Sequence, residues 1–232
     1  MLNLARDVKD VKRFRRILSI LVDEGLGYYV IKSKLHSSLP WKHKLKLALS
    51  KKNNQQLALY LRQAFERLGP TFVKFGQLLS LRPDLVPKEF SEEFTKLQDH
   101  VPSFPYSQAK KIIEEDFKKD INKIFKTFEK KPFASASMAQ VHLATLKSGE
   151  KVAVKILRPD IKEIIDADLD ILFFIAKSLE KHFPETVPFQ PTEVVKEFAL
   201  WTRRELNFQI VGHNGLILKD EIQQLLCEHD KP

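Results

Sequence analysis

The chain has 232 residues, 43% of them hydrophobic, which is enough to bury one sizeable core with a helical extension beside it and excludes a disordered protein. Its one cysteine, Cys227, can form no internal disulfide and has no companion thiols for a structural zinc site, so a reducing compartment is expected. The net charge of +9 lies in the first quarter: residues 1–56 hold 13 Lys and Arg against 4 Asp and Glu, and the two signs balance over 57–232.

No apolar run approaches the roughly 20 residues that a membrane-spanning helix needs. The first ten residues, MLNLARDVKD, lack the apolar core and cleavage site of a secretory signal. We therefore expect a cytoplasmic protein, peripheral at the inner face of the cell membrane if it binds lipid.

The first predicted element is a basic amphipathic helix from Val8 to Val22. Its apolar arc holds Val11, Phe14, Ile17, Leu18, Leu21 and Val22, and its basic arc holds Lys9, Lys12, Arg13, Arg15 and Arg16. Two interpretations stay open: the helix lies on an anionic membrane surface, or it packs on its own domain with a solvated basic face. A nucleic acid is the less favoured anionic partner, because aromatic residues are not interleaved with these charges.

Helices are predicted next over 57–68, 72–81, 88–97 and 106–117. The first ends at Gly69-Pro70, and Thr71 is the expected N-cap of the second. Residues 36–56 are polar and basic and predict a loop or a short helix.

The pattern changes to strands from Phe128 to Leu157. A run to Phe133, a small-residue loop over 134–139, and two strands joined by a turn at 147–150 predict a small antiparallel sheet. Helices over 161–183 and 192–210 follow, separated by the proline-marked segment PETVPFQP.

Lys155, in the run VAVKIL, is the first candidate for chemistry. Strand alternation places Lys155 with Ala153 and Leu157 on one face and Val152, Val154 and Ile156 on the other. An ammonium group on such a face either holds an anion, as the Ala-x-Lys strand of protein kinases holds the α and β phosphates of ATP, or points to solvent from an edge strand.

The loop Ala134, Ser135, Ala136, Ser137 precedes the hairpin, where a kinase carries a glycine-rich phosphate loop. Alanine and serine restrict positive φ angles, so this loop should be stiffer than a glycine-rich one. An ordinary tight connection between strands is the alternative.

Lys74 and Gln77 lie three residues apart on one helix face, with Gly76 between them to admit a close backbone. This arrangement suits docking into a polar crevice, and a solvated helix face is the alternative.

On the helix from Thr192 the apolar stripe is Val194, Val195, Phe198, Trp201 and Phe208. Glu205 falls near the centre of that stripe and needs a cation, for which Lys155 and Lys74 are the candidates.

Taken together, LGPTFVKFGQLLSLRPDLVP, PFASASMAQVHLATL, VAVKILRPDI and PTEVVKEFALWTRRELNF resemble the UbiB family of atypical protein-kinase-like proteins, in order and spacing, over about residues 57–210. The resemblance implies that Lys74, Gly76 and Gln77 form the Lys-x-Gly-Gln motif on a helix over the nucleotide site. It implies that residues 134–137 form the alanine-rich loop and that Lys155 is the phosphate-binding lysine. Lys74, Gln77, Lys155 and Glu205 are thus the expected catalytic set, and residues 134–137 with Lys155 the expected ATP site.

Two departures from the family pattern stand at the end of this region. Glu205 matches the Glu-x-Asp motif, but Asn207 replaces its aspartate, and Val211 stands where a second glutamate pairs with the strand lysine. The catalytic loop, the Asp-Phe-Gly segment and the carboxyl-terminal helices of the family have no counterpart, so no ligands for the Mg²⁺ that such proteins use are identified.

The expected fold is α+β: a protein-kinase-like small lobe with a helical amino-terminal extension and no large lobe. The expected divisions are a basic segment (1–56), a helical extension (57–127), the small lobe (128–210) and a divergent tail (211–232). The resemblance implies ATP binding in support of ubiquinone biosynthesis, with a nucleotide, an anionic membrane surface through residues 8–22 and other ubiquinone-biosynthesis proteins as partners. The alternative is a catalytically inactive, truncated remnant or a regulatory module that binds a partner.

Overall fold

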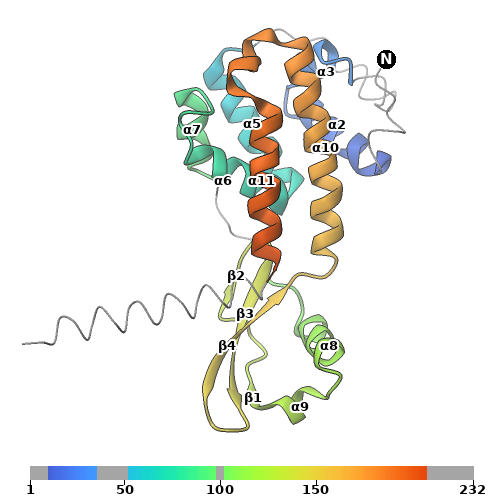
Figure 1. Cartoon of the computed structure of the whole chain (residues 1–232), viewed down its shortest axis with the longest axis vertical. Helices are drawn as coiled ribbons and strands as arrows, with labels where there is room; N and C mark the ends of the chain where they lie inside the picture. The colour runs from blue at the N-terminus through green and yellow to red at the C-terminus, as the bar shows by residue number, and fades with distance from the viewer. Residues whose placement is uncertain (1–9, 36–51, 98–101, 208–232) are drawn as a thin grey trace, which may run out of the picture.

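The computed structural model describes residues 10–35, 52–97 and 102–207 (Figure 1). The elements, in chain order, are α2 (Val11–Asp23), α3 (Gly27–Lys32), α5 (Asn54–Leu68), α6 (Pro70–Ser80), α7 (Lys88–Phe94), α8 (Tyr106–Phe117), α9 (Ile121–Ile124), β1 (Phe125–Phe128), β2 (Ala134–Ser135), β3 (Ala139–Leu146), β4 (Lys151–Leu157), α10 (Ile161–His182), the 3₁₀ helix η2 (Pro184–Phe189) and α11 (Pro191–Leu206). The fold is α+β, as expected.

The larger core lies among the helices. Its buried side chains come from α2, α3, α5, α6, α7, α10 and α11, and Figure 1 shows these helices gathered at one end of the molecule, with α10 and α11 side by side. No helix within the described ranges is both long and apolar enough to cross a bilayer.

The apolar arc of α2 packs into this core. Phe14, Ile17 and Leu18 are fully buried, and the ring of Phe14 meets that of Phe174 on α10 edge to face, with centroids 5.3 Å apart. Burial of this arc favours the interpretation of a helix packed on its own domain, because these side chains are not available to insert into lipid.

Arg13 was expected on the solvated basic face of α2, and this prediction is wrong. Its guanidinium turns inward and donates hydrogen bonds to both carboxylate oxygens of Asp168 on α10, at 2.7 and 3.0 Å, and to the carbonyl oxygen of Leu68, at 2.9 Å. The Asp168 side chain is 1% exposed. The helical period predicts the direction in which the Arg13 side chain points. It cannot show that the buried carboxylate of Asp168, far away in the sequence, lies in that direction.

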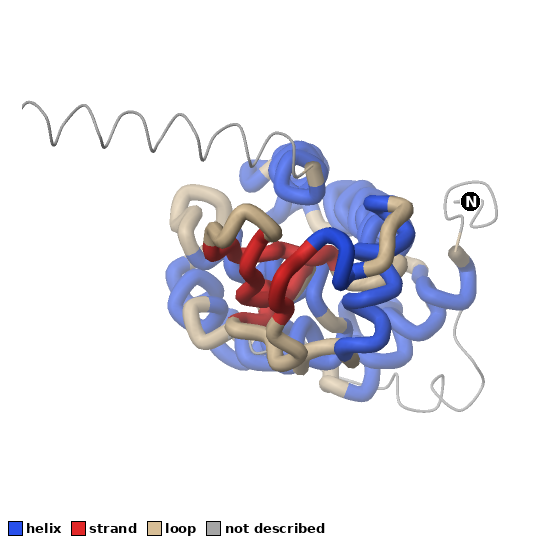
Figure 2. The backbone as a smooth tube through the Cα atoms, turned by 90° about the horizontal axis from the view of Figure 1, so that it is seen from below, coloured by secondary structure: helices blue, strands red, loops and turns tan. Residues whose placement is uncertain are grey.

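The sheet is small and antiparallel. β3 pairs with β4 along one edge, and with β2 and β1 at successive positions along the other. Seen from below, the strands lie together at the end of the molecule away from the long helices (Figure 2). The strand expected to run from 128 to 133 is instead β1, which ends at Phe128.

The two faces of the sheet differ in burial. One face carries Ile156 and Ala144 into a second, smaller core with Ala109 and Ile113 of α8. The other face carries Ala153, Lys155 and Leu143, which are exposed. The sheet therefore has one packed and one open face, as half-buried antiparallel sheets do.

The N-cap expected at Thr71 is wrong. α6 begins at Pro70, two residues before the predicted start at residue 72, and its N-cap is Gly69 with φ 103°. Thr71 is fully buried, with no hydrogen-bond partner for its hydroxyl among the described residues. Proline is favoured at the first helical position because the missing N–H costs nothing there.

Candidate functional site

Lys155 lies on the open face of the sheet, and the alternation predicted for β4 is confirmed. Val152, Val154 and Ile156 turn towards α8, and Ala153 and Lys155 turn to the open side. Lys155 is paired with Val141 on β3, and Val141 is paired on its other side with Ala134 of β2. Ala134 and Lys155 are therefore at the same level of the sheet, two strand spacings or about 10 Å apart.

The alanine-rich loop is a short strand followed by a tight turn. Ala134 and Ser135 form β2, and the Ala136 N–H donates to the Ala139 carbonyl at 2.8 Å, which closes the turn. None of these residues has a positive φ, so the loop needs no glycine.

In this loop three of the backbone carbonyl groups have hydrogen-bond partners, whereas two of the backbone amides do not find one among the described residues. The carbonyl oxygens of Ala136, Met138 and Ala139 all accept hydrogen bonds from protein groups. The N–H groups of Ser137 and Met138 have no acceptor among the described residues. The turn therefore offers amide donors rather than acceptors, which is what an anion requires.

Arg158 is the donor to two of these three carbonyls, those of Ala136 and Met138, and none of the sequence motifs indicated this role. Its Nε and one terminal nitrogen donate to the Ala136 carbonyl at 3.1 and 2.9 Å, and the same terminal nitrogen donates to Ser135 Oγ at 2.9 Å. The other terminal nitrogen donates to the Pro102 carbonyl at 3.0 Å. An arginine three positions after the strand lysine, next to Pro159, was the available signal.

Lys74 on α6 is ion-paired with Glu205 on α11. Of the two cations expected for Glu205, the structure thus provides Lys74. Glu205 does not lie on a core-facing stripe as expected, because its side chain is 50% exposed. Gln77 donates from its amide to the Leu97 carbonyl at 3.3 Å, after the end of α7.

Gly76 admits side chains rather than a backbone. A Cβ atom at this position would lie 2.3 Å from Leu97 Cδ1 and 2.9 Å from Phe65 Cδ2. The glycine of the Lys-x-Gly-Gln motif therefore allows α6 to pack closely on α5 and on Leu97, three residues after the end of α7. This differs from the expected backbone contact.

The apolar stripe expected on α11 holds only in its first half. Val194, Val195 and Phe198 are buried, but Trp201 is 55% exposed. Phe208 and Val211 lie outside the described residues. Asn207, where the family has aspartate, caps the end of α11 and donates its N–H to the Arg204 carbonyl at 3.1 Å.

A second link between α6 and α11 was missed by the sequence analysis. Arg82, just after α6, donates to both carboxylate oxygens of Glu197 at 3.0 and 3.1 Å, and it also binds Asp84. The hydrogen bonds that Arg82 donates to Asp84, and then those to Glu197, raise the pKa of Arg82, and the Arg82 guanidinium lowers the pKa of Asp84. With Lys74–Glu205, this contact holds α6 against α11 at two points.

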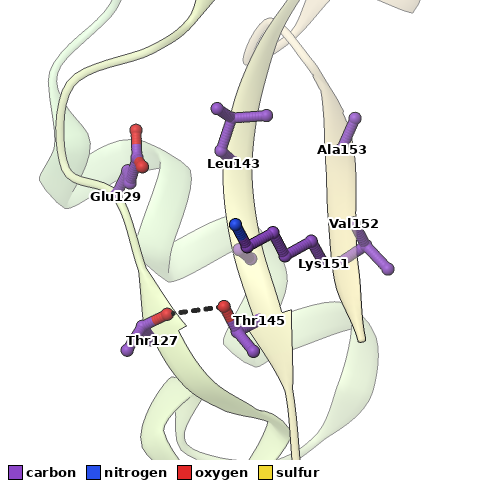
Figure 3. Close-up of a pocket in the computed structure, with 8 residues that line it drawn as sticks. Thr127, Glu129, Leu143, Thr145, Lys151, Val152 and Ala153 are labelled. Atoms are coloured by element: carbon purple, nitrogen blue, oxygen red, sulfur yellow. Dashed lines mark hydrogen bonds between the residues drawn. The ribbon is translucent and has the colours of Figure 1, made fainter. Parts of the chain in front are cut away.

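A depression on the open face lies away from Lys155. It is lined by residues of β1, β3 and β4 near the hairpin turn, including Thr127, Glu129, Leu143 and Lys151, and Thr127 donates to Thr145 at 2.9 Å across it (Figure 3). It contains none of the site residues expected from the sequence. Within residues 10–35, 52–97 and 102–207, side chains of His, Cys, Asp and Glu nowhere gather in threes as a metal site would require.

Comparison with known proteins places the chain among kinase-like relatives. The family model of the ABC1 atypical kinase-like domain matches residues 96–225. A "Probable protein kinase UbiB" of Marinobacter nauticus is 47% identical over 159 residues, which is 68% of this chain and 29% of that protein. The protein of the same name from Aeromonas hydrophila is 38% identical over 217 residues, 91% of this chain and 39% of that protein.

One solved structure, described as the complex of Rv3197 with erythromycin from Mycobacterium tuberculosis, is 32% identical, with a TM-score of 0.41, over 58% of this chain and 34% of that one. The chain spans between 29% and 39% of the length of the two UbiB relatives. On the match of the family model and of these relatives, the chain belongs to the UbiB-type family of ABC1 atypical kinase-like proteins.

Proposed function

We propose that the open face of the sheet binds the phosphates of ATP. The observation that carries this proposal is the register of the three strands, which sets Ala134 and Lys155 at one level on either side of Val141. One side of the site supplies an ammonium group, and the other supplies the Ser137 and Met138 amides, which have no acceptor among the described residues. A cation and free amides facing one anion are the two donor types that phosphate sites use.

The groups present are of the kinds that hold a phosphate. Lys155 would neutralise part of the phosphate charge, and the loop would contact phosphate oxygens through the Ser137 and Met138 amides. ATP would supply a transferable phosphoryl group. Among the residues that the structure describes, no three His, Cys, Asp or Glu side chains gather in a group that could hold the Mg²⁺ used in phosphoryl transfer.

On this basis the chain is proposed to support ubiquinone biosynthesis as part of a UbiB-type kinase or ATPase, with other ubiquinone-biosynthesis proteins as partners. The alternative is a catalytically inactive module that binds nucleotide or a partner. Asn207 favours this alternative for catalysis by the chain alone, because a neutral amide holds a lysine more weakly than the aspartate usual in the family.

Isothermal titration of ATP into the chain and its Lys155→Met variant tests the phosphate site. Removal of the ammonium group should weaken ATP binding by about 10-fold or more, since a hydrogen bond to a charged group contributes about 1.5–3 kcal/mol. Lys151→Met is the matched control, because Lys151 is an exposed lysine on the same face of β4 but opposite Thr145 near the turn. Equal ATP affinity in the two variants would rule out the proposed site.

Steady-state ATP hydrolysis separates the two functions. Turnover by this chain that disappears in Lys155→Met supports a kinase or ATPase role. Binding without turnover supports the inactive module.

A further inference from the structure

The hydrogen bonds of Arg158 have a consequence for the direction of one amide in the loop. Ala136 O and the N–H of Ser137 belong to the same peptide unit, and the described chain contains no cis peptide bond. In a trans peptide the carbonyl and the N–H point in opposite directions. By holding the Ala136 carbonyl with two hydrogen bonds, Arg158 therefore turns the Ser137 N–H away from itself.

Arg158 also forms hydrogen bonds with other residues of the turn. Its own backbone N–H donates to the Met138 carbonyl at 2.9 Å, and its side chain also holds Ser135 Oγ. The guanidinium also contacts the Pro102 carbonyl and the ring of Phe104, whose centroid is 5.8 Å from the guanidinium carbon. Phe104 is itself tied to the sheet, because its N–H donates to the side-chain oxygen of Gln140 at 3.1 Å.

We propose that Arg158 is the positioning residue of the alanine-rich loop, which holds the loop carbonyls back so that the Ser137 amide stays available to a phosphate group. Arg158 acts through the loop and does not itself need to touch the ligand. The planar guanidinium carries its N–H donors in a fixed geometry. It donates two hydrogen bonds to the Ala136 carbonyl, one to Ser135 Oγ and one to the Pro102 carbonyl. A lysine ammonium group cannot reproduce this set of hydrogen bonds. A glycine-rich loop can turn its amides towards a ligand because glycine backbones are flexible. In this loop, which has no glycine, the Arg158 side chain instead fixes the direction of the amide.

The inference rests on the proposed function for the identity of the anion but not for the effect of Arg158 on the loop. Two measurements keep these apart. The first is amide hydrogen exchange over residues 134–140 in the chain without nucleotide. The second is binding of ATP and of adenosine, each by competition against a fluorescent ATP analogue.

Arg158→Gln should accelerate exchange over residues 134–140 and leave the α10–α11 pair unchanged. It should weaken ATP binding by about 10-fold or more, the loss expected for one misdirected hydrogen bond to an anion, and leave adenosine binding unchanged. Arg158→Lys should behave in the same way while retaining the charge, which keeps the test valid if the glutamine variant folds poorly. Arg203→Ala, which removes an arginine that pairs with Asp166 at 3.0 Å, is the control and should change neither measurement.

The outcomes are distinct. Unchanged exchange in both Arg158 variants overturns the inference whether or not the chain binds nucleotide. Equal weakening of ATP and adenosine also overturns it, because a general loss of structure does not discriminate between ligands with and without phosphates. Faster exchange in a chain that binds no ATP even as wild type overturns the proposed function and keeps Arg158 as the residue that holds the loop.

Discussion

Arg13 and Asp168 show how one buried pair can join two elements that are distant in the sequence. The Asp168 side chain is 1% exposed and the Arg13 side chain 18%. A buried pair of this kind contributes little net stability relative to apolar residues, but removal of one partner leaves an uncompensated charge. The pair therefore makes the packing of α2 on α10 sensitive to single substitutions.

Asp168→Ala should lower the free energy of unfolding by about 3–5 kcal/mol, because the Arg13 guanidinium then lacks its buried acceptor. Urea denaturation measures the change, and the double variant Arg13→Met/Asp168→Leu should recover most of it. Arg15→Ala, on the exposed side of the same helix, should stay within about 0.5 kcal/mol of wild type. A loss in Asp168→Ala no larger than in Arg15→Ala would contradict the structural role of the pair.

Among the elements, α5 and α7 are joined by a charged cluster centred on Glu93. Arg62 of α5 donates to Glu93 at 2.6 Å, and Lys96 binds the same carboxylate from the end of α7. The hydrogen bond from Lys96 lowers the pKa of Glu93 most, partial burial opposes this change, and the hydrogen bond from Arg62 adds to it.

The lowered pKa of Glu93 determines how the stability of the protein changes with pH. A carboxyl group whose pKa is lower in the folded state contributes stability above its ordinary pKa of about 4.3, and the contribution is lost as the pH falls through the folded value. Wild type should therefore exceed Glu93→Gln in unfolding free energy by about 1 kcal/mol at pH 7, and the difference should shrink as the pH falls through the lowered pKa of Glu93. Glu92→Gln, whose carboxylate is 64% exposed, should show a smaller difference from wild type than Glu93→Gln at pH 7. A difference for Glu93→Gln that does not shrink as the pH is lowered would refute the ion-pair explanation.

For the whole molecule, the position of α2 changes the way in which a membrane could be bound. Its apolar arc is in the core, and Lys12, Arg15 and Arg16 are exposed. Attachment to an anionic bilayer through this helix would then be electrostatic, without insertion of apolar side chains. Such binding is screened by salt, because the Debye length shortens as ionic strength rises.

Sedimentation with phosphatidylglycerol vesicles across a salt series tests this expectation. Replacement of Lys12, Arg15 and Arg16 by Gln should lower vesicle binding by about 10-fold or more at low salt, at roughly 1 kcal/mol per basic residue near the surface. Replacement of Lys111, Lys118 and Lys119 removes the same charge from α8 and the residues after it, which are also exposed, and should have less effect. Binding that is insensitive to salt, or equal losses in the two triple variants, would exclude α2 as the attachment surface.

The sequence by itself determined the elements that a local period can reveal. The alternation of β4 placed Lys155 on one face, the four motifs established the family, and the helices over 57–68 and 106–117 agree with the structure to within a few residues. These features depend on neighbours within one or two turns or strand positions, so a short window of sequence contains their cause.

Tertiary structure decided which groups meet. The Lys74–Glu205 contact joins residues 131 positions apart, and Arg13–Asp168 joins residues 155 positions apart. The period of a helix gives the direction of a side chain but not what lies opposite, so Arg13 was assigned to solvent and Trp201 to the core. The same reason applies to Arg158, whose role in the alanine-rich loop depends on three carbonyl and hydroxyl groups that only the folded chain brings within hydrogen-bonding distance of it.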